Sequence, residues 1–367
     1  MLLSVIRNGM IRIDRIVYPQ FLPSVMLIVY ISLSFIVGDL SLFISSIKSL
    51  LVVFCILSTL FFLDCKQFEK VIMYLSVFWA IQLGYVVLTI IYRSFYEIGS
   101  FLRPPSGSHI YDAIAREGTF IRTIPAAGQL VSGLAMVSGV WSITFLTFFL
   151  KARGTRHSLI YFLGLISSLA IGVFSGRTSI VVFGAGFLLI SAFDNVPKLK
   201  LISKITFYFA PSVGFAVILI YIFLPFIFSW AFEPFINLLN GNGLSTKSSN
   251  SLIYEHTSRY DSFELLPTFM YKTERGWAAG VDIGYIRYYH FGGVALYLIG
   301  FFWFFKLFSS IRGRFHAKNL SFFIVPTAIL MLVTFKQETI NNASMLGSVV
   351  LLAISLAYLS GKGSESK

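Results

Sequence analysis

Long apolar runs follow one another along almost the whole chain, and they constrain its fold more than any other feature. About ten of them are long enough to cross a bilayer as a helix, which takes roughly 20 residues. With 56% apolar residues and a mean hydropathy of +0.81, the chain has more apolar surface than a soluble core needs. The sequence therefore predicts an all-α, polytopic helical membrane protein. The runs cover approximately residues 21–38, 43–63, 71–92, 126–150, 158–174, 178–193, 205–230, 285–305, 320–335 and 342–360.

The distribution of positive charge predicts the orientation of these helices. Placing the N-terminus in the cytoplasm puts a set of short, mostly basic connections on the cytoplasmic side, as the positive-inside rule requires. This arrangement explains the net charge of +13 without nucleic-acid binding. No small-residue cleavage site follows the first apolar run, so we expect a retained helix there and both termini in the cytoplasm. The basic connections are 1–20, 64–70, 151–157, 194–204, 306–319 and the tail after 360.

The outer side has two long loops, at about 93–125 and 231–284, and its basic residues are mostly arginines. The guanidinium group binds phosphate oxygens in pairs and stays charged when partly dehydrated. An arginine-rich outer face therefore favours an anionic, phosphate-bearing ligand. The alternative is ordinary salt bridging to carboxylates of the outer loops, or contact with anionic lipid head groups. These arginines are Arg93, Arg103, Arg116, Arg122, Arg177, Arg259, Arg275 and Arg287.

A charged stretch, residues 282–293, leads directly into the apolar run 294–305. In one continuous helix, a rise of about 1.5 Å per residue places His290 about 12 Å deeper along the axis than Asp282. Ionisable groups at such depth usually face a bundle interior or a wet cavity, and so indicate a functional site. Alternatively, Asp282 caps the helix, Arg287 extends to the surface and His290 makes a polar packing contact.

Few side chains on the outer side are candidates for a general base. They show no metal-ligand spacing, and the chain has no glycine-rich loop for a soluble nucleotide. The sequence therefore predicts no metal and no cofactor, with the energy for any reaction coming from the substrate. A lipid-linked sugar diphosphate fits these constraints as the substrate. Its diphosphate leaving group needs only positive charge for stabilisation, and the hydroxyl group of the acceptor needs only a general base. The base candidates are His109, Glu255, His256, Asp282 and Glu338.

Several motifs follow in order between about Ile171 and Ala343. With them, the chain resembles the superfamily of O-antigen polymerases (Wzy-type) and O-antigen ligases, which are glycosyltransferases of the bacterial envelope. It departs from that pattern where an extra Gly176 precedes Arg177 and where Gln337 separates Lys336 from Glu338. The motifs are the turn Ser175-Gly176-Arg177-Thr178, an outer loop with Arg259 and Phe263, the glycines Gly276 and Gly280, the run from Asp282 to Arg287 with Gly284 and Tyr285, the pair Gly292-Gly293, and Phe335-Lys336-Gln337-Glu338.

The resemblance implies one transmembrane glycosyltransferase domain over 1–367, in the bacterial inner membrane, with its active site facing the periplasm. It would transfer a growing glycan from undecaprenyl diphosphate to an undecaprenyl-diphosphate-linked repeat unit, without a metal. Membrane lipids would surround it, and a separate protein would control chain length. By this resemblance Arg177, Arg259, Tyr285, Arg287, His290 and Lys336 would bind substrate, and His256, Asp282 and Glu338 would be catalytic.

Three other functions compete with polymerisation. An O-antigen ligase, which moves finished glycan onto lipid A-core, differs only in its acceptor. A lipid-linked oligosaccharide flippase needs charged groups along a path through many spans, whereas Lys48 is the only charge that we place in the middle of a span. A membrane scaffold would not need arginines in tight turns between helices.

Overall fold

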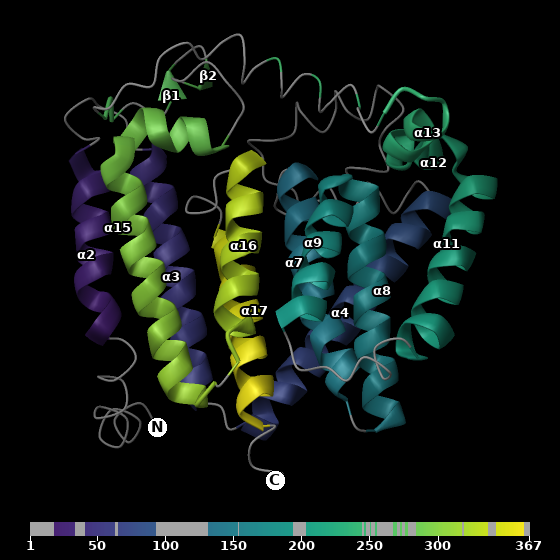
Figure 1. Ribbon diagram of the computed structural model, residues 1–367, viewed down its shortest axis with the longest axis horizontal. Coiled ribbons are helices and arrows are strands. Elements are labelled where there is room, and N and C mark those ends of the chain that lie inside the picture. The colour runs from purple at the N-terminus through teal and green to yellow at the C-terminus, as the bar shows by residue number, and fades with distance from the viewer. Residues whose placement is uncertain are drawn as a thin grey trace. The chain divides into compact units, whose positions relative to one another are not determined.

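The computed structural model describes residues 18–33, 41–62, 65–92, 131–152, 154–193, 203–243, 246, 250, 254, 267–269, 272–273, 276–277, 284–317, 319–336 and 343–362. Within these ranges the regular elements are helices apart from one antiparallel pair of two-residue strands (Figure 1). The chain divides into two compact units, of which the first contains 1–70 and 251–367 and the second contains 71–250. The predicted single glycosyltransferase domain stays a prediction.

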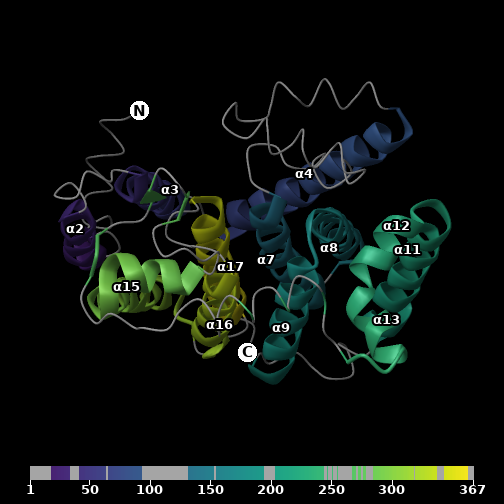
Figure 2. The same ribbon diagram turned by 90° about the horizontal axis from the view of Figure 1, so that it is seen from above.

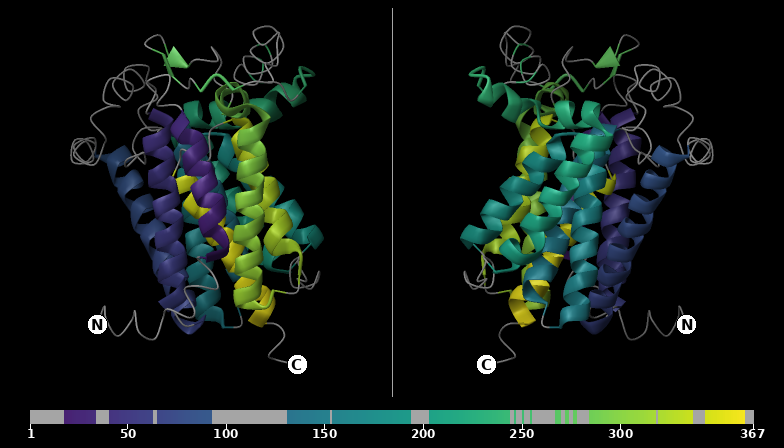
Figure 3. Two further views of the ribbon diagram at one scale, coloured as in Figure 1. Left: turned by 90° about the vertical axis from the view of Figure 1, so that its left-hand side faces the viewer. Right: turned by 90° about the vertical axis from the view of Figure 1, so that its right-hand side faces the viewer.

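The first unit joins the two ends of the chain. Helix α17 packs against α3, α15 and α16. Helix α15 also packs along α2, and the left view of Figure 3 shows these two helices side by side. The indole nitrogen of Trp303 on α15 donates a buried hydrogen bond of 2.8 Å to the hydroxyl group of Ser24 on α2. The elements of this unit are α2 (Tyr18–Ser32), α3 (Ser41–Phe62), β1 (Lys272–Thr273), β2 (Gly276–Trp277), α15 (Gly284–Phe315), α16 (Ser321–Lys336) and α17 (Ala343–Lys362), with β1 and β2 antiparallel.

The second unit is organised around α7, which packs against α8 and α9 (Figure 2). Every residue of α7 from 133 to 150 is buried. The unit also includes most of α4, whose first six residues belong to the first unit. Its elements are α4 (Cys65–Ile91), α7 (Val131–Lys151), α8 (Thr155–Ser175), α9 (Thr178–Phe193), the π-helix η5 (Ile205–Phe209), α11 (Ala210–Phe223), α12 (Pro225–Ala231) and α13 (Glu233–Leu239).

Small residues let α7, α8 and α9 approach one another closely. A Cβ atom added at Gly172 would lie 2.7 Å from the Cβ atom of Ser179 and 3.0 Å from that of Ser138. The hydroxyl groups of Ser142 and Ser168 form a hydrogen bond of 2.9 Å between α7 and α8. Glycine and serine at such contacts are typical of helices that associate in a membrane, where close packing replaces the hydrophobic effect.

The described helices include six that are long and apolar enough to span a membrane, which confirms the prediction of a helical membrane protein at this level. Four shorter apolar helices fall within the remaining predicted runs. The total of about ten spans and the position of the termini stay predictions. The six helices are Gln67–Ile91, Gly133–Lys151, Thr155–Ser175, Thr206–Phe223, Tyr285–Gly313 and Ala343–Gly361; the four shorter ones are Pro23–Ser32, Ser46–Leu57, Thr178–Phe193 and Ser321–Thr334.

The span predicted over about 205–230 is present as the candidate span Thr206–Phe223, but it ends seven residues earlier than predicted. Helix α11 ends at Phe223, Leu224 has non-helical dihedral angles (φ −136°, ψ 57°), and Pro225 begins the separate helix α12. Proline lacks the backbone N–H that continues a helix and prefers the first helical turn, so the break falls directly before it.

We predict that Gly172→Ala destabilises the second unit by about 1–3 kcal/mol, because the added methyl group has no room between α7 and α9. The measurement is thermal unfolding of the purified protein in lipid nanodiscs. Gly184→Ala on α9 is the matched control, since no described atom lies within 4 Å of its added Cβ. Equal stability of the two variants would contradict the packing argument.

Candidate functional site

A sharp bend in α15 shapes the candidate site. Gly293 has dihedral angles φ 56° and ψ −161°, and it divides α15 into a short helix, residues 284–292, and a long helix, residues 294–315. Figure 1 shows the short helix lying across the end of the long one. The expectation of one continuous helix that carries His290 deep along a single axis is therefore wrong. Only glycine adopts these dihedral angles readily, so Gly293 is where the chain can turn.

Residues from elsewhere in the first unit cap the end of the short helix. Its last carbonyl groups have no partner within the helix, because the helix stops at the bend. The backbone N–H and hydroxyl groups of Thr268 donate to the carbonyl oxygen of His290, at 3.1 and 2.8 Å. The N–H group of Phe269 donates to the carbonyl oxygen of Phe291 at 2.9 Å. The hydroxyl group of Tyr30 on α2 donates to the carbonyl oxygen of Gly292 at 2.6 Å.

Phe269 makes its capping contact in a strained conformation. Its φ angle is 55°, in the left-handed region that bulky residues rarely adopt. Its ring centroid lies 5.5 Å from that of Tyr30 and 6.0 Å from that of Phe291, so both neighbours hold it in place. Such strain persists only where the surrounding contacts fix it, and it concentrates at functional sites.

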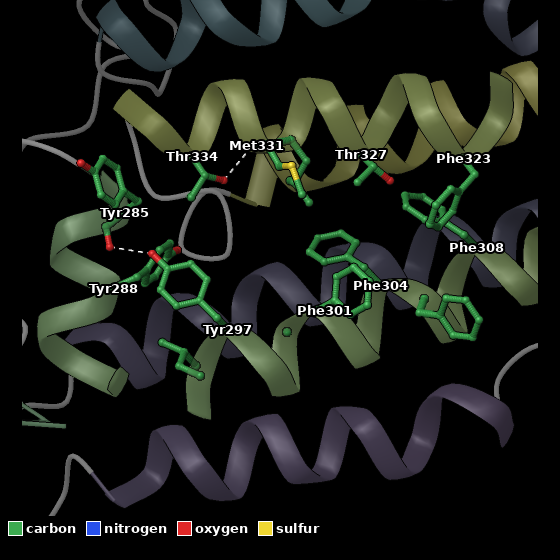
Figure 4. Close-up of a pocket in the computed structure, with 14 residues that line it drawn as sticks. Tyr285, Tyr288, Tyr297, Phe301, Phe304, Phe308, Phe323, Thr327, Met331 and Thr334 are labelled. Carbon is green, nitrogen blue, oxygen red and sulfur yellow. Dashed lines mark hydrogen bonds between the residues drawn. The ribbon is translucent and has the colours of Figure 1, made fainter. Parts of the chain in front are cut away.

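The start of the short helix is held by the long helix. The hydroxyl group of Tyr297 reaches back across the bend and donates to the carbonyl oxygen of Tyr285 at 2.6 Å (Figure 4). The short helix is therefore fixed at both ends by tyrosine hydroxyl groups, one from α2 and one from the long helix.

An apolar groove of about 330 Å³ runs between the long helix and α16. Phenylalanine rings form much of its wall, and tyrosine and threonine side chains add hydroxyl groups (Figure 4). Met331 is 63% exposed and Phe301 57%, so the groove opens on the flank of these helices. Exposed apolar side chains of spanning helices face lipid in a bilayer, so this opening is lateral. The groove is lined by Tyr285, Tyr288, Leu296, Tyr297, Gly300, Phe301, Phe304, Phe305, Phe308, Phe323, Thr327, Leu330, Met331 and Thr334.

Thr327 contributes a polar atom to the wall of the groove. Its hydroxyl oxygen is buried, and it has no hydrogen-bond partner among the residues that the structure describes. Figure 4 shows Thr327 on α16, on the side of that helix that faces the long helix. Thr327 lies halfway along the groove, so its substitution by a larger residue tests whether function requires an open groove.

Arg287 lies on the short helix and is only 4% exposed. Tyr285 and Tyr288, on either side of it, line the end of the groove nearest the bend. Burying a guanidinium group costs free energy unless other groups compensate its charge. A buried arginine at the end of a spanning helix therefore indicates a functional site.

One of the sequence-predicted residues, Tyr285, lines the groove, and three others lie on the elements that form the same end of it. Tyr285, Arg287 and His290 lie on the short helix, and α16 ends at Lys336, two residues after the groove residue Thr334. His290 contributes its carbonyl oxygen to the bend, through the contact with Thr268. The other candidates, Arg259, His256, Asp282 and Glu338, and the side chain of Lys336, lie outside the described residues.

Arg177 belongs to the second unit and has a protein carboxylate as its partner. It lies in the turn between α8 and α9, forms an ion pair with Glu233 of α13, and its guanidinium carbon lies 4.9 Å from the ring centroid of Trp230. The side chains of Arg177 and Glu233 are 18% and 25% exposed. This contact supports the salt-bridge interpretation at Arg177. The Glu233-Pro234 pair is typical of a helix start. This pattern marks Glu233 as a first-turn carboxylate, but it does not predict the pairing with Arg177.

The tyrosines that hold the bend were not predicted from the sequence. Tyr30 and Tyr297 lie within apolar runs. In such a run the sequence does not distinguish a tyrosine that makes a specific hydrogen bond from one that only packs. Their role depends on hydrogen bonds to backbone atoms that are 262 and 12 residues away.

Comparisons of the chain with protein-family models, with curated proteins and with solved structures gave no match. The assignment of a function therefore rests on the residues and geometry of this chain.

We predict that Gly293→Ala straightens or loosens the bend, at a cost of about 1–3 kcal/mol, because alanine is strained at these dihedral angles. Hydrogen exchange of the amides in 284–292 should become faster. Gly313→Ala on the same helix is the control, since its added Cβ meets no described atom within 4 Å. Unchanged exchange in Gly293→Ala would show that the bend does not depend on glycine.

Proposed function

We propose that the protein is a polysaccharide polymerase of the bacterial inner membrane. It transfers a growing glycan from undecaprenyl diphosphate to an undecaprenyl-diphosphate-linked repeat unit, and it needs no metal. The proposed topology has about ten spans, both termini in the cytoplasm and a site that faces the periplasm. A separate protein that regulates chain length is the partner that we expect.

The observation that carries this proposal is the apolar groove that ends at the bend of α15. The lining residues of the long helix extend to Phe308, 11 residues beyond Tyr297, which corresponds to about 16 Å along the helix axis. An isoprenoid chain is long, narrow and apolar, and it reaches such a groove sideways from the bilayer. Burial of apolar area against the aromatic wall stabilises the bound chain.

We place the diphosphate at the end of the groove nearest the bend of α15. Arg287 supplies a guanidinium group from the short helix, and Lys336 at the end of α16 is a second cation in the sequence of this region. Arginine pairs with phosphate oxygens through two parallel hydrogen bonds. A lipid chain in the groove therefore places its diphosphate near fixed positive charge, which stabilises the diphosphate as it leaves.

The proposed reaction is a glycosyl transfer. A hydroxyl group of the lipid-linked repeat unit attacks the anomeric carbon of the donor glycan, and its proton passes to a general base. The bond between that carbon and the diphosphate oxygen breaks, and undecaprenyl diphosphate leaves with the bonding electrons. His256, Asp282 and Glu338 are the candidates for the base or for orienting it. Arg177 and Arg259 are the candidates for holding the diphosphates together with Arg287.

The deciding experiment is a polysaccharide gel of a strain without this gene, beside one that carries the wild-type gene. Loss of long chains with a single repeat persisting on the core identifies polymerisation as the missing step. Loss of the single repeat as well contradicts the proposal and indicates a ligase or a flippase. Polymer that accumulates on lipid in the outer leaflet identifies the ligase.

We predict that Arg287→Ala reduces polymer formation on the order of a hundredfold, because a fixed positive donor is lost from the leaving group. Arg312→Ala is the matched control, since Arg312 lies on the same helix, is exposed and is far along α15 from the bend. The measurement is the same gel, with protein amount in the membrane checked by immunoblotting. Full chain length in Arg287→Ala would remove Arg287 from the site.

We predict that Thr327→Phe blocks the groove and shortens or abolishes the polymer, because a ring fills the space that an isoprenoid chain would occupy. Leu332→Phe is the control, because Leu332 lies on the same helix, is partly exposed and does not line the groove. Photo-crosslinking with an isoprenoid probe measures chain binding directly. Equal crosslinking of both variants and the wild type would place the lipid chain elsewhere.

A further inference from the structure

Tyr297 takes part in both halves of the candidate site. Tyr297 lines the groove and the residue is 38% exposed, whereas its hydroxyl group donates a hydrogen bond of 2.6 Å to the carbonyl oxygen of Tyr285. Tyr285 is in the first turn of the short helix, two residues before Arg287. One side chain thus connects the wall of the groove to the backbone that carries the arginine.

Tyr30 provides the natural comparison within the same structure. Its hydroxyl group holds the other end of the short helix, at the carbonyl oxygen of Gly292, also at 2.6 Å. Tyr30 does not line the groove. The two tyrosines therefore make equivalent contacts with the short helix, but only Tyr297 is in a position to contact a chain bound in the groove.

We propose that Tyr297 is a positioning residue that couples occupation of the groove by an isoprenoid chain to binding of a diphosphate at Arg287. This inference rests on the proposed function, and it adds a reason why the site prefers lipid-linked diphosphates over free ones. Coupling of this kind is a free energy shared between two sites, so each ligand tightens the binding of the other by the same factor.

The physical origin of the coupling is the rotational freedom of the tyrosine ring. A partly exposed ring samples several rotamers, and each departure from the observed one breaks the hydrogen bond to Tyr285. A chain packed against the ring removes that freedom, so the hydroxyl group stays on its acceptor. The short helix and Arg287 are then held in one orientation before the diphosphate arrives, and a preorganised site binds more tightly.

The test measures the affinity of the full-length protein in nanodiscs for inorganic diphosphate, with and without farnesol, a short isoprenoid alcohol. We expect farnesol to tighten diphosphate binding in the wild type by about fivefold or more. In Tyr297→Phe that factor should fall to about one, because the phenyl ring still contacts the chain but has no hydroxyl group. Farnesol binding itself should persist in this variant.

Tyr30→Phe separates coupling from general loosening of the short helix. Loss of one hydrogen bond there should weaken diphosphate binding about two- to tenfold, but the tightening by farnesol should remain. An equal loss of tightening in both tyrosine variants, or its persistence in Tyr297→Phe, would overturn the assignment of Tyr297. Arg287→Ala must also abolish diphosphate binding; if it does not, the inference is wrong.

If the proposed function itself is wrong, the same experiment gives a result that differs from the one expected when only the coupling is wrong. A wild-type protein that binds neither farnesol nor inorganic diphosphate lacks the substrate site altogether, and both proposals fall. A wild-type protein that binds both without any tightening keeps the proposed function and excludes the coupling.

Discussion

The hydrogen bonds that cap the bend of α15 are the contacts on which the rest of the candidate site depends. A helix that stops at or near a membrane leaves carbonyl groups without partners, and no water in the hydrocarbon core can satisfy them. At Gly293 the chain stops one helix and begins another, and Thr268, Phe269 and Tyr30 satisfy the carbonyl groups that result. Without these donors the short helix would not lie across the long one, and Tyr285 and Tyr288 would not line the end of the groove.

Two of the arginines that the sequence singled out occupy different environments. Arg177, in the second unit, has the carboxylate of Glu233 and the ring of Trp230 as neighbours. Arg287, in the first unit, is buried on a short helix next to groove residues. Arg177 has a protein carboxylate at ion-pair distance, and Arg287 lies between Tyr285 and Tyr288 in the sequence of the short helix.

In the second unit, as at the bend, polar groups in an apolar setting need hydrogen-bond partners within the protein. Ser138, Ser142 and Thr144 lie in the buried stretch 133–150 of α7, and each donates its hydroxyl group to a carbonyl oxygen of the preceding turn. Polar side chains are tolerated in this apolar setting because the backbone satisfies them locally. Their small size allows α8 and α9 to pack closely against α7, so a composition that is unfavourable for a soluble core is suited to helix association in lipid.

The sequence by itself determined that the chain is a set of apolar helices, because each long apolar run can satisfy its backbone groups in lipid only as a helix. It also singled out Tyr285, which lines the groove, and Arg287, His290 and Lys336, which lie on the short helix or at the end of α16. Only the tertiary structure decided the direction of the chain after Gly293, the pairing of Arg177 with Glu233, and the groove between the long helix and α16. These features depend on contacts between residues far apart in the chain, which local hydrophobic periodicity does not encode.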